Sequence, residues 1–174
     1  MAHAFVRGRL GLTAAGIVSI IFKMIRTRTN QRGHEIAIAL RRAYLGMHRR
    51  ANAALVGSGV TADQFVVLNA LSDGRAVTQQ ELAGALSTDP NTLRAMLVIL
   101  DRKNLIRRDP HPTDRRARLV TLTEEGERVH ACLWSATDAL RHSLVSVLGE
   151  ADTELFLSLL QRFEKAMSPK ESTA

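Results

Sequence analysis

The strongest chemical feature of the chain is a run of basic residues between positions 102 and 118. Its basic residues are Arg102, Lys103, Arg107, Arg108, Arg115, Arg116 and Arg118, and its acids are Asp109 and Asp114. Seven positive charges minus two negative charges give this short run a net charge of +5. Because positive charge at this density repels itself, the run indicates either an anionic partner or a fully solvated surface.

The composition of the whole chain agrees with an anionic partner. Its 174 residues carry a formal net charge of +7, which favours nucleic acid or an anionic surface as partner. Aromatic residues make up only 4% of the chain, and this disfavours a single-strand or RNA binder that stacks bases on aromatic side chains. Binding to duplex DNA remains open.

Residue types that would indicate an enzyme or a metal centre show no suitable spacing. The six histidines have no paired metal-ligand spacing and no cysteine partner. No serine stands in a nucleophile elbow, and no glycine-rich phosphate loop is present. The sequence therefore predicts no catalytic residue, no metal and no cofactor. Cys132, the single cysteine, excludes an intramolecular disulfide, and its place on an apolar helical stripe predicts a buried thiol.

A helix-turn-helix precedes the basic run. Thr78-Gln79-Gln80-Glu81 is a capping box that opens a short helix. Asp89 followed by Pro90 predicts the N-cap and the first position of a second helix. The inward face of that helix is an apolar stripe at helical spacing, made of Leu93, Met96, Leu97 and Leu100.

The outward face of the second helix is suited to reading base edges. It carries Asn91, Thr92, Arg94, Ala95 and Val98. Asparagine and arginine can make bidentate hydrogen bonds to adenine and guanine, and the apolar side chains can contact thymine methyl groups. A solvated helix face is the alternative for the whole set, and inward packing is a further alternative for Val98.

Two strands joined by a turn follow the second helix. Residues 105–108 and 117–122 have strand composition, and residues 109–114 are rich in turn-forming types. The basic run then lies on a β-hairpin attached to a helix-turn-helix. The predicted fold class is therefore mostly α with a small β-hairpin wing.

The residues of the hairpin resemble those of a known family. The run from Asp114 to Gly126, DRRARLVTLTEEG, resembles the wing of the multiple-antibiotic-resistance regulator (MarR) family, and the segment from Glu81 to Leu105 resembles its helix-turn-helix. The resemblance covers roughly residues 35–167. It implies a winged helix-turn-helix transcriptional regulator, which is not an enzyme. It also raises a redox role for Cys132 as the alternative to a buried thiol.

The resemblance also implies roles for the wing residues. Arg115 and Arg116 stand where the family's wing enters the minor groove, where arginine reads groove shape more than sequence. Asp114 is expected to hold the hairpin tip or to orient an arginine, and Arg118 adds to the same basic DNA-binding surface. A solvated basic loop is the alternative.

Helical patterns flank the winged helix-turn-helix on both sides. Residues 35–56 predict a long first helix, and Thr61 and Gln64 belong to a capping box that opens the next one. Residues 123–149 predict one long helix that Gly149 ends, and residues 150–167 predict a last helix with a rich apolar face. Because that face must be buried, we expect a homodimer whose two recognition helices lie about 34 Å apart on a palindromic duplex operator. The resemblance implies the same arrangement.

These patterns predict the organisation of the chain. Residues 1–33 form a basic N-terminal extension, 34–57 and 123–167 the helical dimerisation region, 58–122 the DNA-binding winged helix-turn-helix, and 168–174 a tail. The uncharged stretch from Leu10 to Phe22 is shorter than the ~20 residues of a membrane span. Three hypotheses remain for residues 1–33: a secretory signal, an amphipathic surface helix, or an extension translated from an upstream start codon in place of Met24. The last is favoured.

The resemblance further implies a small-molecule effector of unknown identity. Its pocket is expected where the first and fifth helices meet the winged-helix lobe, lined by Tyr44, Met47, His48, Phe65 and Trp134, for each of which core packing is the alternative. The predicted function is a cytoplasmic DNA-binding transcriptional regulator, with repression or activation both open to a winged helix. The alternatives are a protein-interaction module, an architectural DNA-binding module, and a membrane-associated regulator anchored by residues 1–33.

Overall fold

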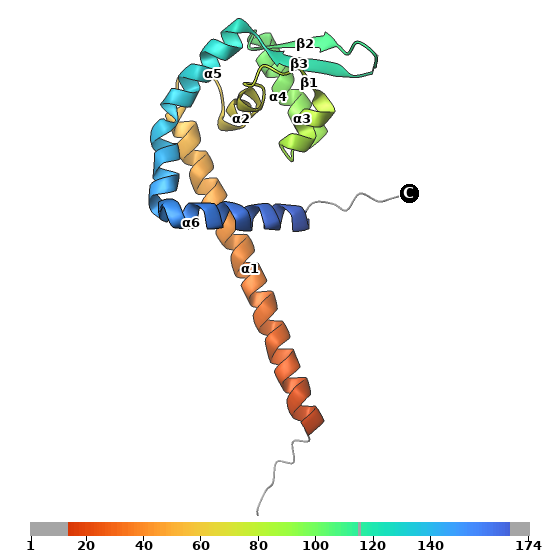
Figure 1. Ribbon diagram of the computed structural model, residues 1–174, viewed down its shortest axis with the longest axis vertical. Helices are drawn as coiled ribbons and strands as arrows, with labels where there is room; N and C mark the ends of the chain where they lie inside the picture. Colours follow the sequence, from red (N-terminus) through yellow and green to blue (C-terminus); the bar gives the residue numbers. More distant parts are fainter. Residues whose placement is uncertain (1–13, 115, 168–174) are drawn as a thin grey trace, which may run out of the picture. The chain divides into compact units, whose positions relative to one another are not determined.

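The computed structural model describes residues 14–114 and 116–167, with side chains described at Arg26 and from Arg28 onward (Figure 1). The chain divides into two compact units, Met1–Met47 and His48–Ala174. Helices dominate the described residues, together with one small antiparallel sheet. The predicted fold class is confirmed.

The first helix is longer than the sequence predicted. Helix α1 spans Ala14–Ala54, whereas the predicted start was near Glu35. No proline interrupts this stretch, and extending an existing helix adds one backbone hydrogen bond for each residue fixed. Helical geometry therefore continues through Gly33 without needing an apolar face there. Residues 1–13, which belong to the predicted extension, lie outside the described residues.

The winged-helix part of the second unit is built around one apolar core. Helices α2 (Ala62–Ala70), α3 (Gln79–Ala85) and α4 (Pro90–Arg102) each bury one face in it. The largest fully buried side chains are Val67, Leu68, Leu71, Leu82, Leu93, Leu97, Leu100, Ile106 and Val120. Burial of each contributes ~1.5–3 kcal/mol. The predicted stripe of α4 is confirmed, with Met96 only half-buried at the edge of the core.

The predicted helix N-caps are formed. The Thr61 hydroxyl accepts the Gln64 amide at 3.2 Å, and the Gln64 side chain accepts the Thr61 amide at 3.2 Å. The Thr78 hydroxyl likewise accepts the Glu81 amide at 3.2 Å, while the Glu81 carboxylate accepts the Thr78 amide at 2.7 Å. Thr123 caps the helix that follows the wing. Such caps can be read from the sequence because all their partners lie within three residues.

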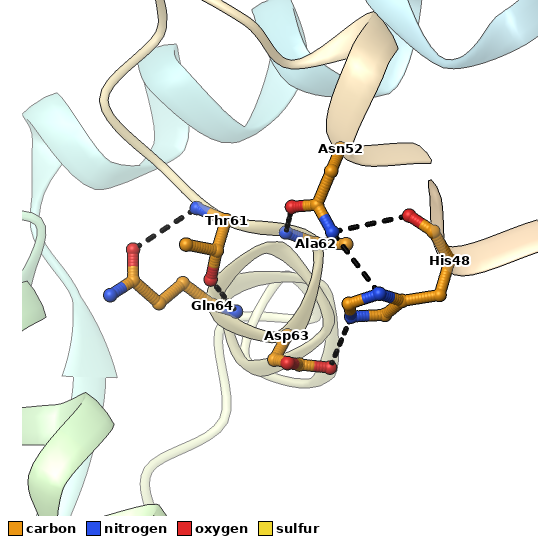
Figure 2. A network of polar contacts seen from close by, with 6 residues as sticks. All are labelled: His48, Asn52, Thr61, Ala62, Asp63 and Gln64. Carbon is orange, nitrogen blue, oxygen red and sulfur yellow. Dashed lines mark hydrogen bonds and ion pairs between the residues drawn. The ribbon is translucent and has the colours of Figure 1, made fainter. Parts of the chain in front are cut away.

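A polar network in the second unit joins the last turns of α1 to the first turn of α2 (Figure 2). The Asn52 side chain accepts the Ala62 amide at 2.9 Å and donates to the His48 carbonyl at 3.1 Å. Nε2 of the His48 ring lies 3.2 Å from the carboxylate of Asp63, in the first turn of α2. Because Asn52 bonds to both segments, it fixes the angle at which the chain enters α2.

The sheet has the strand order β1-β3-β2 and is antiparallel throughout. Its strands are β1 (Val77–Thr78), β2 (Ile106–Pro110) and β3 (Arg118–Leu122). The β2–β3 hairpin projects beyond α3 and α4 as a wing (Figure 1). The prediction of a loop at residues 109–110 is wrong, because Pro110 pairs with Arg118 on an edge strand, where a missing N–H is tolerated. The two-residue strand β1 was not predicted.

The helix predicted over residues 123–149 is broken. Helix α5 spans Glu124–Ala136 and α6 spans Asp138–Met167. Thr137 interrupts them because its hydroxyl donates to the Leu133 carbonyl at 2.9 Å and its carbonyl accepts the amides of the next helix. Within α6, Gly149 has the non-helical φ of 75°, so the predicted helix end at that residue is confirmed as a kink.

The C-terminal helices leave much apolar surface uncovered. Helix α6 buries no residue, and its exposed large apolar side chains are Leu144, Val145, Val147, Leu155, Phe156, Leu157, Leu159, Leu160, Phe163 and Met167. The prediction that Cys132 is buried is wrong for the single chain, because α5 turns the neighbouring Leu133 into the core instead. Among the described residues, no helix is both long and apolar enough to cross a membrane.

Candidate nucleic-acid interface

The outward face of α4 is held in place from both its end and its back. The Asp89 carboxylate accepts the amides of Asn91 and Thr92, both at 3.0 Å, and Pro90 occupies the first turn. On the back, the buried leucines of α4 fix its rotation about its own axis. The exposed side chains of the predicted readout face are Asn91, Thr92, Arg94 and Ala95. Val98 is half-buried, so it is only partly available to a partner.

The turn between α3 and α4 is fixed by backbone contacts. Ser87 has a positive φ of 47°, which reverses the chain direction. The Thr88 amide donates to the Ala83 carbonyl at 3.0 Å, and its hydroxyl donates to the Leu86 carbonyl at 3.0 Å. These bonds close the C-terminal end of α3 and set the angle at which α4 leaves it.

The wing tip is organised by two side chains. Nδ1 of His111 accepts the amides of Thr113 at 3.3 Å and Asp114 at 3.1 Å. The Asp114 carboxylate accepts the Arg116 amide at 2.9 Å, and the Asp114 carbonyl accepts the Ala117 amide at 3.1 Å. The tip is therefore a closed turn that presents the side chain of Arg116 outward. Arg115 lies outside the described residues.

An open hollow of about 700 Å³ lies between the wing and the helix-turn-helix. It is lined by Thr78, Gln79, Gln80, Pro90, Arg94, His111, Asp114, Arg116, Ala117 and Arg118. The fold thus brings Arg94 of α4 to the same hollow as Arg116 and Arg118 of the wing. With neutral histidine, three arginines minus one aspartate give the lining a net charge of +2. This hollow can accept an anionic strand in contact with both elements.

Sequence reasoning assigned no site role to six residues of this hollow. Thr78, Gln79, Gln80 and Pro90 were read as helix starts, His111 as part of a loop and Ala117 as part of a strand. Local pattern held no signal for them, because about thirty positions separate the start of α3 from the wing and only strand pairing brings them together. The Glu81 carboxylate bonds to Thr78, a residue that lines the hollow. Hydrogen bonds from the Thr78 hydroxyl and amide lower the pKa of Glu81, so the helix cap stabilises its negative charge.

The basic run of the sequence does not form one surface. Arg107 pairs with Asp109 at 2.6 Å on the outer side of β2. Arg108 turns toward the start of α3, where its guanidinium lies 3.4 Å from the Gln79 side-chain oxygen. Lys103, at the end of α4, donates to the Gly59 carbonyl. Only part of the +5 charge therefore reaches the hollow.

The predicted effector-pocket residues are distributed over both units. Tyr44 and Met47 lie in the first unit and are exposed there. In the second unit, the ring of Phe65 stacks on His130 at 5.8 Å between centroids, and His130 lies 6.1 Å from Trp134. Burial lowers the pKa of His130. His48 is instead engaged with Asp63 in the network of Figure 2.

Trp134 of this aromatic cluster makes one further contact. The Arg141 guanidinium lies 3.8 Å from the centroid of the Trp134 ring, which is a cation–π contact. Trp134 nevertheless keeps 44% of its surface exposed. Within residues 14–114 and 116–167, no three His, Cys, Asp or Glu side chains are grouped so that they could hold a metal ion.

Comparison with known proteins shows which family shares this architecture. Residues 60–117, which include the helix-turn-helix and most of the wing, match the sequence profile of the MarR family. The transcriptional regulator HosA of Escherichia coli O111:H- is 31% identical over 107 residues, which cover 62% of this chain and 79% of HosA.

Solved structures show the same fold. The MepR–DNA complex of S. aureus matches with a TM-score of 0.70 and 26% identity, covering 75% of this chain and 97% of MepR. BpsR of Bordetella bronchiseptica, whose DNA binding is regulated by 6-hydroxynicotinic acid, matches with a TM-score of 0.68 and 29% identity, covering 75% of this chain and 98% of BpsR. This chain therefore belongs to the MarR family of transcriptional regulators, as its wing and helix-turn-helix residues had indicated.

Proposed function

We propose that the chain regulates transcription as a homodimer, with α4 in the major groove of duplex DNA and the wing in the adjacent minor groove. The observation that carries this proposal is the hollow that joins Arg94 of α4 to Arg116 and Arg118 of the wing. A phosphate strand seated there would be contacted from both sides. The similarity to MepR, solved in complex with DNA, supports DNA as the partner.

Residues of α4 supply the proposed base readout. Asn91 and Arg94 are exposed and can form bidentate hydrogen bonds to adenine and guanine edges. Thr92 and Ala95 complete the exposed face, and the half-buried Val98 can add a methyl contact to thymine. Each correct bidentate pair contributes about 1–3 kcal/mol of discrimination between bases.

The wing supplies the proposed minor-groove contact. Arg116 is exposed and lies within the turn that Asp114 closes. Arg115 is proposed to act beside it, and Arg118 to contact the phosphates at the base of the wing. Because a narrow minor groove concentrates negative potential, arginine there contributes affinity and shape recognition more than base identity.

The dimer is proposed from the uncovered surface of α6. Its exposed side chains include the stripe Phe156, Leu160 and Phe163, which would stay in water in a single chain. Residues 34–57 and 123–167 are proposed to form the dimerisation region around the DNA-binding residues 58–122. A two-fold axis would place the two α4 helices about one DNA turn apart, so the operator should be an inverted repeat.

A small effector is proposed to adjust this spacing. BpsR, the relative regulated by 6-hydroxynicotinic acid, provides the precedent. Phe65 and Trp134, on either side of His130, and His48 are the candidates for contact with it in the second unit. Tyr44 and Met47 are separate candidates in the first unit. An effector that binds one dimer geometry better than another would shift the population toward that geometry.

Selection of bound sequences from a random duplex library, at near-physiological salt and with the full chain, tests the proposal. Enrichment of an inverted repeat with half-sites about one helical turn apart is the expected result. Salt-sensitive binding without any enriched sequence would overturn sequence-specific regulation in favour of an architectural role. Absence of binding to duplex DNA would favour the protein-interaction alternative.

Single variants separate the two contacts. Arg116→Ala should lower affinity for all sequences and flatten the slope of log affinity against log salt by about one unit. Arg94→Ala should cost about 1–3 kcal/mol for the selected operator and relax selectivity at one position of each half-site. Arg128→Ala, an exposed position paired with Glu125 on α5, is the charge-matched control and should change neither quantity. Equal behaviour of all three variants would contradict the assigned contacts.

A further inference from the structure

The described part of the first unit is strongly basic. Between residues 26 and 47 it carries five arginines and one acid, Glu35, so five minus one gives a net charge of +4. The arginines are Arg26, Arg28, Arg32, Arg41 and Arg42, and every one of them is exposed on α1. The proposed DNA contacts of α4 and the wing use none of these residues.

These arginines differ from three exposed arginines of the second unit. Arg75, Arg107 and Arg128 each have a carboxylate partner within 3 Å, at Asp73, Asp109 and Glu125 respectively. In the part of the chain that the structure describes, no ion pair involves the five arginines of the first unit. Their charge is therefore available to an external anion.

The spacing of the arginines suits a long polyanion. The interval from Arg26 to Arg42 is sixteen residues of continuous helix, or about 24 Å at 1.5 Å per residue. Duplex DNA carries one negative charge per ~1.7 Å of its axis, so that length faces on the order of 14 phosphates. The arginines at 26–32 and those at 41–42 can therefore contact phosphates at the same time, whatever the base sequence of the DNA.

We infer that residues 26–42 of α1 form a basic arm that binds the DNA phosphate backbone without reading base sequence. The inference goes beyond the proposed function, which assigns DNA contacts only to α4 and the wing. It rests on that function in its choice of polyanion, since a chain already bound to DNA holds the arm at high local concentration near phosphates.

An anionic membrane surface is the competing partner, and the side chains of the arm disfavour it. A helix that lies on a membrane needs a continuous apolar face that enters the acyl boundary. The two turns of α1 from residue 28 to 35 contain no apolar side chain: they read Arg28, Thr29, Asn30, Gln31, Arg32, Gly33, His34 and Glu35. The large apolar side chains of the arm, Ile36, Ile38 and Leu40, lie only beyond this polar stretch, so no apolar face runs along the whole arm. Such a helix suits a solvated, charged partner such as DNA.

The test compares three forms of the full chain on a random-sequence duplex. They are the unchanged protein, R26Q/R28Q/R32Q, which removes three charges, and R26K/R28K/R32K, which keeps them. Each phosphate contact contributes about 0.9 to the slope of log affinity against log salt, so the glutamine variant should lose about 2.7. Between ~50 and ~200 mM salt, the affinity of the unchanged protein should then fall about 40-fold further than that of the variant.

The lysine variant is the matched control. Because ammonium and guanidinium both neutralise a phosphate, it should keep the slope of the unchanged protein. Circular dichroism checks that all three forms have the same helix content. An unchanged slope in the glutamine variant, or a lysine variant that loses as much slope as the glutamine one, overturns the basic arm.

Two further measurements separate the competing readings. If the unchanged protein sediments with phosphatidylserine vesicles, and the glutamine variant loses that binding while keeping its DNA slope, the arm is a membrane contact instead. Selection from the duplex library tests the proposed function separately. An enriched inverted repeat with equal slopes in all forms rejects the arm alone, whereas a changed slope with no enriched repeat supports the arm and rejects sequence-specific regulation.

Discussion

The winged-helix core and helix α6 treat their apolar residues in opposite ways. Around α2, α3, α4 and the sheet, large apolar side chains reach complete burial within a single chain, with Leu68, Leu97 and Leu100 at 0% exposure. Helix α6 buries no residue, and Phe156 and Phe163 keep 42% and 41% of their surface exposed. Both regions are rich in apolar residues, but only the winged-helix core buries them within a single chain.

The difference indicates what each region needs in order to be stable. A closed core derives its stability from contacts within the chain, so that stability does not depend on protein concentration. An open apolar face becomes stable only when another surface covers it, which makes its stability depend on the concentration of the partner. The proposed second copy of this chain is such a partner, and four measurements test this difference between the two regions.

The largest expected effect is in the closed core. Leu97→Ala removes a side chain that is fully buried on α4, and it should lower the free energy of unfolding by about 2–5 kcal/mol at any protein concentration. Urea unfolding followed by circular dichroism measures this change. Ile99→Ala, on the same helix but 40% exposed, should change the free energy by less than about 0.5 kcal/mol. Similar losses in both variants would show that the core is not closed as described.

A second effect concerns the junction between the wing and α5. A Cβ atom added to Gly126 would lie 1.9 Å from the Leu105 carbonyl oxygen, a backbone atom that cannot move aside freely. Gly126→Ala should therefore destabilise the winged helix by about 1–3 kcal/mol in thermal or urea unfolding.

Gly84→Ala is the control for that substitution. Gly84 is also helical, but nothing lies within 4 Å of the position that an added Cβ atom would occupy, so alanine should be neutral or slightly stabilising there. A neutral Gly126→Ala variant would mean that α5 can withdraw from the core without loss.

The third effect should appear only in the open region. Leu160→Ala removes apolar surface from the stripe that includes Phe156 and Phe163, and it should weaken the proposed dimer by about tenfold. Analytical ultracentrifugation measures the dissociation constant. Leu157→Ala removes the same atoms from a position off that stripe and should leave dimerisation unchanged. Equal effects of the two variants would argue against α6 as the contact surface.

The smallest effect is a pH dependence in the aromatic cluster between α2 and α5. Burial lowers the pKa of His130, so its ring binds a proton less readily in the folded state than in the unfolded chain. His130 should therefore contribute stability above the unfolded histidine pKa of about 6.5, and this contribution is lost as the pH falls below it.

Unfolding curves at about pH 7.5 and pH 5.5 test this sign. The unchanged protein should lose more stability between them than His130→Phe, whereas His142→Gln, at a position whose side chain is 79% exposed, should keep the loss of the unchanged protein. A His130→Phe variant with the same pH dependence as the unchanged protein would remove the histidine from the explanation.

Local chemistry was enough to predict several features. The capping boxes at Thr61 and Thr78, the N-cap at Asp89 and the kink at Gly149 all depend on neighbours within a few residues. The apolar stripe of α4 was likewise correct, because a 3.6-residue period identifies the inward face of a helix. The exposure of Asn91, Thr92, Arg94 and Ala95 follows from that same period.

Other features depended on long-range contacts and were missed or misjudged. Thr137 ends α5 through its own side chain, although the apolar period continues across it. Cys132 was placed in the core, but the stripe of α5 rotates Leu133 inward instead. Pro110 joins a strand because it lies at a sheet edge, which no local pattern reveals. The early start of α1 at Ala14 needed no sequence signal beyond the absence of a breaker.

Most of the elements and the faces they present follow from the sequence, since hydrogen bonds and periodicities within one or two turns set them. Which charges share a site depends on tertiary contacts. Pairing of β3 with both β1 and β2 brings Arg116 and Arg118 to the hollow that Arg94 lines, while Arg107 and Arg108 turn elsewhere. Charge counted along the chain cannot make that distinction, because strand pairing joins residues that are far apart in sequence.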